Sequence, residues 1–179
     1  MMTFYEHTYE TAPEGAVKRM KGVERQLGFV PAAVARMATA PATLEGFQTM
    51  SALFETVSLE PIEREVVIMT VAVRYECRLC IAMHSAKLTK LEASDELIGA
   101  LRNGNPLDDP RLEALRHFTL NAIDNHGHVD EPTMVAFDDH GYTPQQALEV
   151  VLGIAAYTLS TFANRMTDAP IDEPLRAFA

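Results

Sequence analysis

The feature that most restricts the fold of this chain is a segment near its C-terminus that is apolar or small on nearly every side of a helix. It opens with "TPQQ" at Thr143, where threonine can cap a helix, proline fits the first turn and Gln146 occupies the position of a capping-box partner. Apolar and small residues then surround the helix from Ala147 to Ala163. A helix of this kind is central to a core or buried between subunits.

The rest of the chain also has the periodicity of helices rather than strands. Glycines, prolines and capping residues divide it into segments that we expect to be helical, at residues 15–28, 29–41, 42–58, 59–76, 79–93, 94–104, 108–127 and 130–141. The tail, residues 168–179, is expected to be irregular or a short terminal helix. With no alternating pattern, repeat or linker, the sequence predicts an all-α helical bundle in one domain over residues 1–179.

Composition and charge restrict the partners of the chain. The 179 residues include 47% apolar and 22% charged residues, as in ordinary globular proteins, and the net charge is −10. Such a charge opposes nucleic-acid phosphates and anionic membrane surfaces, so we expect neither as a partner. The longest apolar runs, residues 66–73 and 150–157, are predicted to be too short to span a bilayer. The N-terminal decapeptide has no signal-peptide pattern, which favours the cytoplasm.

The stretch "CRLCIAMH" contains both cysteines, Cys77 and Cys80, at the expected start of a helix. Two cysteines placed at random would have this spacing on the order of one time in a hundred. Free N–H groups and the helix dipole at that end stabilise a thiolate, which is the species that attacks a peroxide oxygen or a disulfide. The second thiol lies one turn away and can close a small disulfide ring.

Two further side chains complete the candidate site. His84 follows Cys80 by four residues, so both share one helix face, and an imidazole there can take the thiol proton or stabilise the thiolate. Glu65 would lie roughly 18 Å from Cys77 on one continuous helix. If the chain reverses near residues 74–76, an antiparallel helical hairpin brings Glu65 opposite His84, where it can orient the ring.

The same residues allow other interpretations. The two cysteines can be inert packed thiols, and Glu65 alone can be a solvated carboxylate at a helix start. Zinc is a third possibility, with Cys77, Cys80, His84 and Glu65 as nominal ligands. Zinc sites that contain this cysteine spacing usually recruit a second cysteine pair, and the chain has no other cysteine, so we expect no metal.

The spacing Glu65–x11–Cys77–x2–Cys80–x3–His84 resembles the signature of the AhpD-like alkylhydroperoxidases, within the carboxymuconolactone decarboxylase superfamily. Residues 59–86 resemble the family's core, and the flanking segments at residues 27–47, 107–130 and 141–175 resemble the family in the family's order. The resemblance implies an all-helical fold, homotrimers or trimer-based homohexamers, and thiol-dependent reduction of organic hydroperoxides.

The resemblance also implies roles for individual residues. Glu65 and His84 match the family's proton relay, Cys80 matches its peroxide-attacking thiol and Cys77 its resolving thiol. Some members have a further relay histidine at the position of Leu79, which puts high peroxidase turnover in question. The superfamily's decarboxylases generally lack the cysteine pair, so decarboxylation is disfavoured.

These observations favour a thiol peroxidase of antioxidant defence that cycles between a dithiol and a disulfide. We expect no bound cofactor, and an external dithiol, lipoyl or thioredoxin-like, as the reductant. One alternative is a general disulfide oxidoreductase or redox sensor with little peroxidase activity, which the leucine at position 79 favours. Another is a non-enzymatic oligomeric scaffold with inert thiols.

Overall fold

The computed structural model describes residues 3–179, so the first two residues of the N-terminal decapeptide lie outside the described part. Within residues 3–179 there is no strand, which confirms the all-α prediction. The helices are α1 (Glu14–Leu27), α2 (Ala32–Met37), α3 (Pro41–Phe54), α4 (Pro61–Arg74), α5 (Arg78–Lys90), α6 (Asp95–Asn103), α7 (Pro110–Asp124), α8 (Glu131–Asp139), α9 (Pro144–Met166) and the 3-10 helix η1 (Glu173–Phe178).

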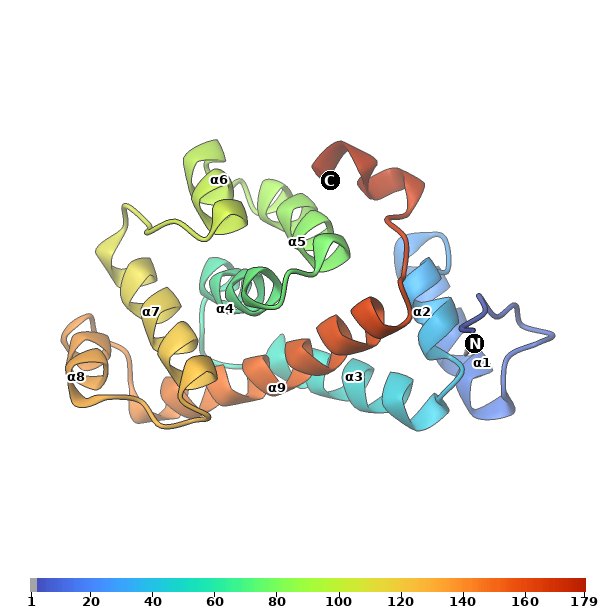
Figure 1. The fold of residues 1–179 in the computed structure, drawn as a ribbon, viewed down its shortest axis with the longest axis horizontal. Helices are drawn as coiled ribbons and strands as arrows, with labels where there is room; N and C mark the ends of the chain where they lie inside the picture. Colours follow the sequence, from blue (N-terminus) through green and yellow to red (C-terminus); the bar gives the residue numbers. More distant parts are fainter. Residues whose placement is uncertain (1–2) are drawn as a thin grey trace.

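The helix at the centre of the bundle is α4. It packs against α5, α6, α7 and α9, and Figure 1 shows α5 and α6 above it, α7 to its left and α9 crossing below. Every residue from Val66 to Ala72 is buried. This run of apolar residues therefore fills the core, which identifies α4 rather than α9 as the helix enclosed within the chain.

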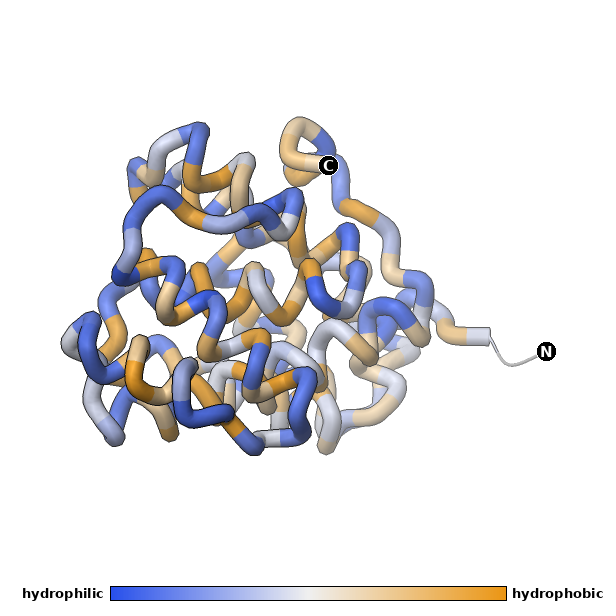
Figure 2. Tube along the Cα trace, turned by 60° about the vertical axis from the view of Figure 1, so that its left-hand side comes forward, coloured by the Kyte–Doolittle hydropathy of each residue, from blue (hydrophilic) through white to orange (hydrophobic). Residues whose placement is uncertain are grey.

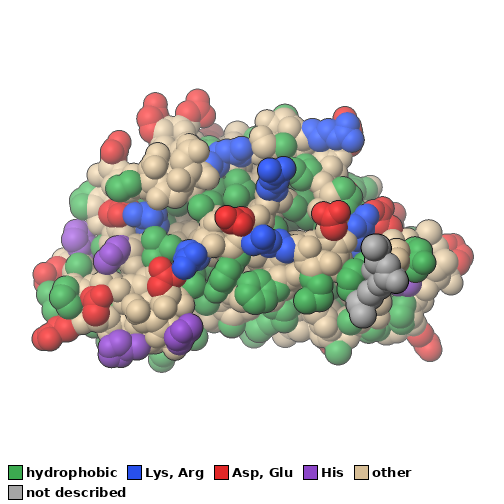
Figure 3. Space-filling view, in the orientation of Figure 1, with side chains coloured by type: hydrophobic (Ala, Val, Ile, Leu, Met, Phe, Trp, Pro, Cys, Tyr) green, Lys and Arg blue, Asp and Glu red, His purple; other side chains and the backbone are tan. Residues whose placement is uncertain are grey.

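The last long helix, α9, is covered on one face only. Its inner face packs against α3 and α4, whereas Leu148, Val151, Phe162 and Met166 are each at least half exposed. Figure 3 shows green apolar side chains along the lower part of this surface, where α9 runs. Of the two places predicted for this helix, a central one in the core of the chain is thus wrong, because α4 occupies the centre, and burial between subunits stays a prediction. With 23 residues, α9 is long and apolar enough to cross a membrane by length and composition alone, a test that a core helix of a soluble protein also passes.

Local signals in the sequence fix most helix ends. The capping box at the start of α9 is present, with the Gln146 N–H donating to the Thr143 hydroxyl and the Thr143 N–H donating to the Gln146 side chain. Gly28 and Gly104 end α1 and α6 in the left-handed conformation, which a glycine adopts without strain. Figure 2 shows apolar and polar positions alternating along the helical turns, as an amphipathic bundle requires.

The reversal between α4 and α5 forms without a glycine. Glu76 adopts the left-handed conformation at φ 54°, the Cys77 N–H donates to the Ala72 carbonyl (2.8 Å), and the Glu76 N–H donates to the Val73 carbonyl (3.0 Å). These two bonds are those of a Schellman motif that ends α4. The turn folds α5 back along α4, which confirms the predicted antiparallel hairpin with the cysteine pair at the start of its second helix.

The C-terminal tail returns to cover α5. The Ala32 N–H donates to the Asp172 carboxylate (3.1 Å), and the Arg102 side chain donates to the Phe178 carbonyl (2.5 Å). Ile171, just before the first anchor, and Leu175, between the two, pack against the apolar cluster that contains both cysteines. The tail therefore shields the start of α5 from water.

Candidate functional site

The hairpin brings the predicted carboxylate and imidazole together. The Nδ1 atom of His84 lies 2.7 Å from Oε2 of Glu65, across the α4–α5 interface. Glu65 has no exposed surface and His84 is 8% exposed, so this is a buried pair and not a solvated carboxylate at a helix start. A carboxylate at Nδ1 fixes the orientation of the ring and supports a proton on it.

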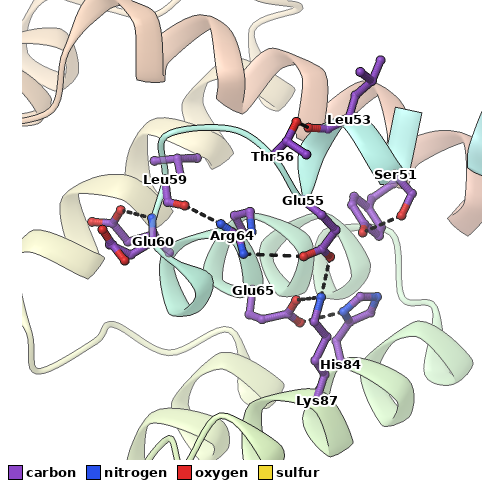
Figure 4. Close-up of polar contacts among 12 residues, drawn as sticks. Ser51, Leu53, Glu55, Thr56, Leu59, Glu60, Arg64, Glu65, His84 and Lys87 are labelled. Carbon is purple, nitrogen blue, oxygen red and sulfur yellow. Dashed lines mark hydrogen bonds and ion pairs between the residues drawn. The ribbon is translucent and has the colours of Figure 1, made fainter. Parts of the chain in front are cut away.

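Lys87 is the residue of this cluster that the sequence analysis missed. Its Nζ lies 2.9 Å from Oε1 of Glu65 and 2.5 Å from Oε1 of Glu55, at the end of α3 (Figure 4). Burial opposes ionisation of Glu65, but His84 and Lys87 outweigh it and hold the pKa of that carboxyl below its usual value. The one signal in the sequence was its position three residues after His84, on the same face of α5.

The two sulfur atoms lie at the other end of the hairpin. Cys77 occupies the N-cap position of α5, where its sulfur accepts the Cys80 N–H at 3.4 Å. Its own thiol points to Cys80, with 2.6 Å between the two Sγ atoms. Both cysteines are free and both are buried, at 2% and 5% exposed. A disulfide between them requires only a small further approach of the sulfurs.

Neutral donors surround the sulfur of Cys80. The thiol of Cys77 donates to it, Nδ2 of Asn164 donates at 3.4 Å, and Oγ1 of Thr161 lies 3.5 Å away. The Cys77 thiol has the largest effect and, against the opposing effect of burial, the hydroxyl, the amide and the His84 charge help it to lower the pKa of Cys80 to about 6. The same contact raises the pKa of Cys77. Of the two sulfurs, Cys80 is therefore the one that ionises first.

The surroundings of the sulfurs are apolar. Leu79, the residue at the position of the missing relay histidine, is 3% exposed and belongs to the same cluster as Ala33, Ala72 and the two cysteines. The ring of His84 is further packed edge-to-face against Tyr157 of α9, with 5.3 Å between the ring centroids. The sulfurs and the ring thus lie in buried, largely apolar surroundings, in which electrostatic and hydrogen-bond interactions are strong.

The four residues weighed as zinc ligands divide into two pairs. Glu65 contacts His84 at one end of the hairpin, and Cys77 contacts Cys80 at the other. Among residues 3–179, no three or more histidine, cysteine, aspartate or glutamate side chains are gathered in a way that could hold a metal ion.

The chain is similar to known proteins in sequence over part of its length and in fold over nearly all of it. Residues 39–119 match the model of the carboxymuconolactone decarboxylase family, a segment that contains the whole Glu65-to-His84 pattern. The match confirms the resemblance recognised from that pattern. No curated protein matches the chain in sequence.

Solved structures share the fold over nearly the whole chain. A peroxidase-related protein with an alkylhydroperoxidase AhpD core from Ralstonia eutropha JMP134 has a TM-score of 0.85 at 22% identity, covering 98% of this chain and 95% of that one. A peroxidase-related protein from Silicibacter sp. TM1040 has a TM-score of 0.80 at 17% identity, covering 99% and 95%. A cysteine-to-alanine variant of the debrominase Bmp8, in complex with 2,3,4-tribromopyrrole, has a TM-score of 0.76 at 18% identity, covering 99% and 96%. At these identities the likeness establishes the fold alone.

Proposed function

We propose that this protein is a thiol-dependent peroxidase that reduces organic hydroperoxides in antioxidant defence, as the match of residues 39–119 to the carboxymuconolactone decarboxylase family model supports. The single observation that carries the proposal is the asymmetry of the two sulfurs. Cys80 receives hydrogen bonds that favour its thiolate, whereas Cys77 keeps its proton and lies 2.6 Å away. A thiolate beside a protonated thiol is the arrangement that attack and resolution by two cysteines requires.

In the first half of the cycle, the Cys80 thiolate attacks the terminal, hydrogen-bearing oxygen of a hydroperoxide. The O–O bond breaks, Cys80 becomes a sulfenic acid, and the alkoxide leaves with the electron pair. The protonated ring of His84, oriented by Glu65, supplies the proton that converts the alkoxide into an alcohol.

In the second half, Cys77 resolves the sulfenic acid. Its sulfur forms the disulfide with Cys80, the S–O bond of the sulfenic acid breaks, and the thiol proton, passed through His84, joins the departing hydroxyl to form water. An external dithiol, lipoyl or thioredoxin-like, then reduces the disulfide by thiol–disulfide exchange. No bound cofactor takes part in this cycle.

The test separates the roles of the two sulfurs. Cumene hydroperoxide is mixed with the reduced protein, and sulfenic acid is trapped with dimedone and located by mass spectrometry. Cys80→Ser should form no sulfenic acid, Cys77→Ser should accumulate it on Cys80, and the unaltered protein should yield the disulfide. Sulfenic acid on Cys77 in the Cys80→Ser variant would reverse the roles, and absence of any thiol oxidation would refute the function.

A second candidate is a general disulfide oxidoreductase or redox sensor with little peroxidase activity. The observation that favours it is Leu79, which fills with apolar packing the position of a further relay histidine. Reduction of a small disulfide substrate at a rate well above that of cumene hydroperoxide would favour this candidate. The likeness to Bmp8 adds a third assay, release of bromide from a bromopyrrole, since a thiolate can also attack an electrophilic halogen.

The proposal extends to the assembly and the location of the protein. The exposed apolar face of α9, with Leu148, Val151, Phe162 and Met166, supports a homotrimer or homohexamer in which this face is covered. Sedimentation at micromolar concentration tests it, and a monomer would remove the support. A pair of free thiols supports a cytoplasmic location. A single domain over residues 1–179, with no nucleic-acid or membrane partner, stays a prediction.

A further inference from the structure

Two side chains of α9 reach the sulfur of Cys80 from a part of the chain that the cysteine motif does not include. Thr161 and Asn164 are one helical turn apart and project from the same face of α9. Both are buried, at 1% and 8% exposed, and each has a polar atom within 3.5 Å of the Cys80 sulfur. Burial of a hydroxyl and an amide costs free energy that their hydrogen bonds must offset, so their place at this sulfur calls for a physical reason.

The amide of Asn164 is only half satisfied. Its Nδ2 donates to the Cys80 sulfur, whereas its Oδ1 is buried and, within the part of the chain that the structure describes, receives no hydrogen bond. A carboxamide oxygen accepts hydrogen bonds and cannot donate them, so this end of the side chain calls for a donor. Oδ1 and Nδ2 belong to one small planar group, and Nδ2 contacts the Cys80 sulfur. A donor that binds Oδ1 would therefore lie beside that sulfur.

We propose that Thr161 and Asn164 are catalytic residues, and that Asn164 Oδ1 binds the O–H group of the hydroperoxide while Asn164 Nδ2 and the Thr161 hydroxyl hold the Cys80 thiolate. The inference rests on the proposed peroxidase function and names the group that recognises its substrate. A hydroperoxide carries one hydrogen-bond donor, on the oxygen that the thiolate attacks. A hydrogen bond from that O–H group to Oδ1 therefore places the oxygen that is attacked against the sulfur.

The hydrogen bond survives the reaction. The Cys80 sulfur forms a bond to the terminal oxygen, the O–O bond breaks with its electron pair on the alkoxide, and the alkoxide takes a proton from His84. The transferred oxygen keeps its hydrogen, so the sulfenic acid of Cys80 presents the same O–H donor to Asn164 Oδ1. One acceptor thus serves the bound substrate and the oxidised cysteine.

Neutral groups dominate the immediate surroundings of Cys80. The titratable groups that act on the sulfur pair are the Cys77 thiol and the His84 imidazole from α5 and the Arg165 guanidinium from α9. Beyond His84 lie Glu65 and Lys87. Because Thr161 and Asn164 are uncharged, their removal changes the hydrogen bonds to the sulfur and leaves these charges in place.

The first experiment measures the thiolate. Alkylation of the reduced protein by iodoacetamide is followed against pH, and trypsin, which cleaves after Arg78, places the two cysteines on separate peptides for mass spectrometry. Thr161→Val and Asn164→Leu should each raise the midpoint for Cys80 by about one pH unit, since a hydrogen bond to a charged group is worth roughly that shift. Thr161→Ser should restore the original midpoint. Thr119→Val is the matched control, because Thr119 is buried and its hydroxyl bonds Leu115 instead.

The second experiment isolates Oδ1. At a pH where Cys80 is fully ionised in every variant, the rates of oxidation by cumene hydroperoxide and of alkylation by iodoacetamide are compared. Asn164→Leu should lose at least about tenfold in the first rate relative to the second, whereas Thr161→Val should lose little, since it keeps Oδ1. Asn164→Ala replaces Asn164→Leu if the leucine variant does not fold.

The outcomes separate this inference from the proposed function. Unchanged Cys80 midpoints in the Thr161 and Asn164 variants would overturn the thiolate contacts, and equal loss of both rates in Asn164→Leu would overturn the role of Oδ1. If the unaltered protein does not react with hydroperoxide, the proposed function and the role of Oδ1 fail together, while the alkylation midpoints still decide the thiolate contacts.

Discussion

The two ends of the α4–α5 hairpin both bury reactive groups, but they stabilise them by different means. At the open end, Glu65 has no exposed surface and lies between the nitrogens of His84 and Lys87, at 2.7 and 2.9 Å. At the turn, Cys80 is also buried, but the groups that contact its sulfur are a thiol, a hydroxyl and an amide. One end balances charge with charge, and the other uses neutral donors.

The difference follows from what each end must do. A carboxylate that stays ionised needs permanent counter-charges, and removing one leaves an uncompensated buried charge at a large cost in stability. A sulfur that alternates between thiol, thiolate, sulfenic acid and disulfide carries its charge for only part of the cycle, and neutral donors tolerate every one of these states. Substitutions at the open end should therefore lower the stability of the protein, and substitutions at the turn should lower the reactivity of Cys80.

The largest expected effect comes from Lys87→Met, which removes a counter-charge of Glu65. Breaking a buried pair costs about 3–5 kcal/mol, and we expect about 2–3 kcal/mol because the Lys87 side chain is 37% exposed. Urea unfolding at neutral pH measures it, with Lys90→Met, an exposed lysine of the same helix, as the control. A variant as stable as the unaltered protein would contradict the charge-balance account. The iodoacetamide midpoint of Cys80 should stay close to that of the unaltered protein.

Gly153→Ala tests the packing of α9, the helix that contacts both ends of the hairpin. A Cβ at this position would lie 2.7 Å from the ring of Phe54 and 3.0 Å from Val67, so the helices would have to move apart. Overpacking of this kind should cost about 1–2 kcal/mol despite the better helix propensity of alanine. Gly46→Ala, where a Cβ meets nothing within 4 Å, should instead leave stability unchanged or increase it. Thermal melts of the two variants make the comparison, and equal melting temperatures would show that α9 is not closely packed there.

Lowering the pH should remove the contribution that Glu65, at the open end, makes to the unfolding free energy. The folded-state pKa of Glu65 lies below its unfolded value, so the carboxylate adds stability above the unfolded pKa of about 4.3 and loses it as the pH falls through the folded pKa. In Glu65→Gln the decline of unfolding free energy between about pH 5 and pH 3 should be shallower, by up to about 1 kcal/mol per pH unit. Urea midpoints over this range measure it. If the unfolding free energies of Glu65→Gln and the unaltered protein fall equally steeply below pH 5, Glu65 does not titrate as the geometry requires.

The smallest effect is expected at the turn itself. Glu76 adopts φ 54°, a left-handed conformation that strains any residue with a Cβ. Glu76→Gly should relieve that strain and raise stability by about 0.5 kcal/mol after the entropy of glycine is allowed for. Glu92, at φ 58° after α5, offers the matched change Glu92→Gly. Differential scanning calorimetry resolves both, and a loss of stability in either would show that the glutamate side chain matters more than the backbone.

Much of this protein could be predicted from the sequence because its signals are local. Helix ends at Gly28 and Gly104 and the capping box of Thr143 and Gln146 each depend on a few neighbouring residues. The cysteine spacing and the face shared by Cys80 and His84 are properties of a single helix. The hairpin needed one further step, a reversal near residues 74–76, and the pairing of Glu65 with His84 followed from counting residues back from it.

Tertiary structure alone decided which helix is enclosed and which distant side chains complete the site. The apolar pattern could not place α4 rather than α9 at the centre, because every helix with a wide apolar face competes for that position. Thr161 and Asn164 lie 81 and 84 residues from Cys80, where no helical spacing relates them to the sulfur. A local motif determines which group can react, whereas the packing of α9 against the hairpin determines which donors surround it, because hydrogen bonds act over a few ångströms of space and not along the chain.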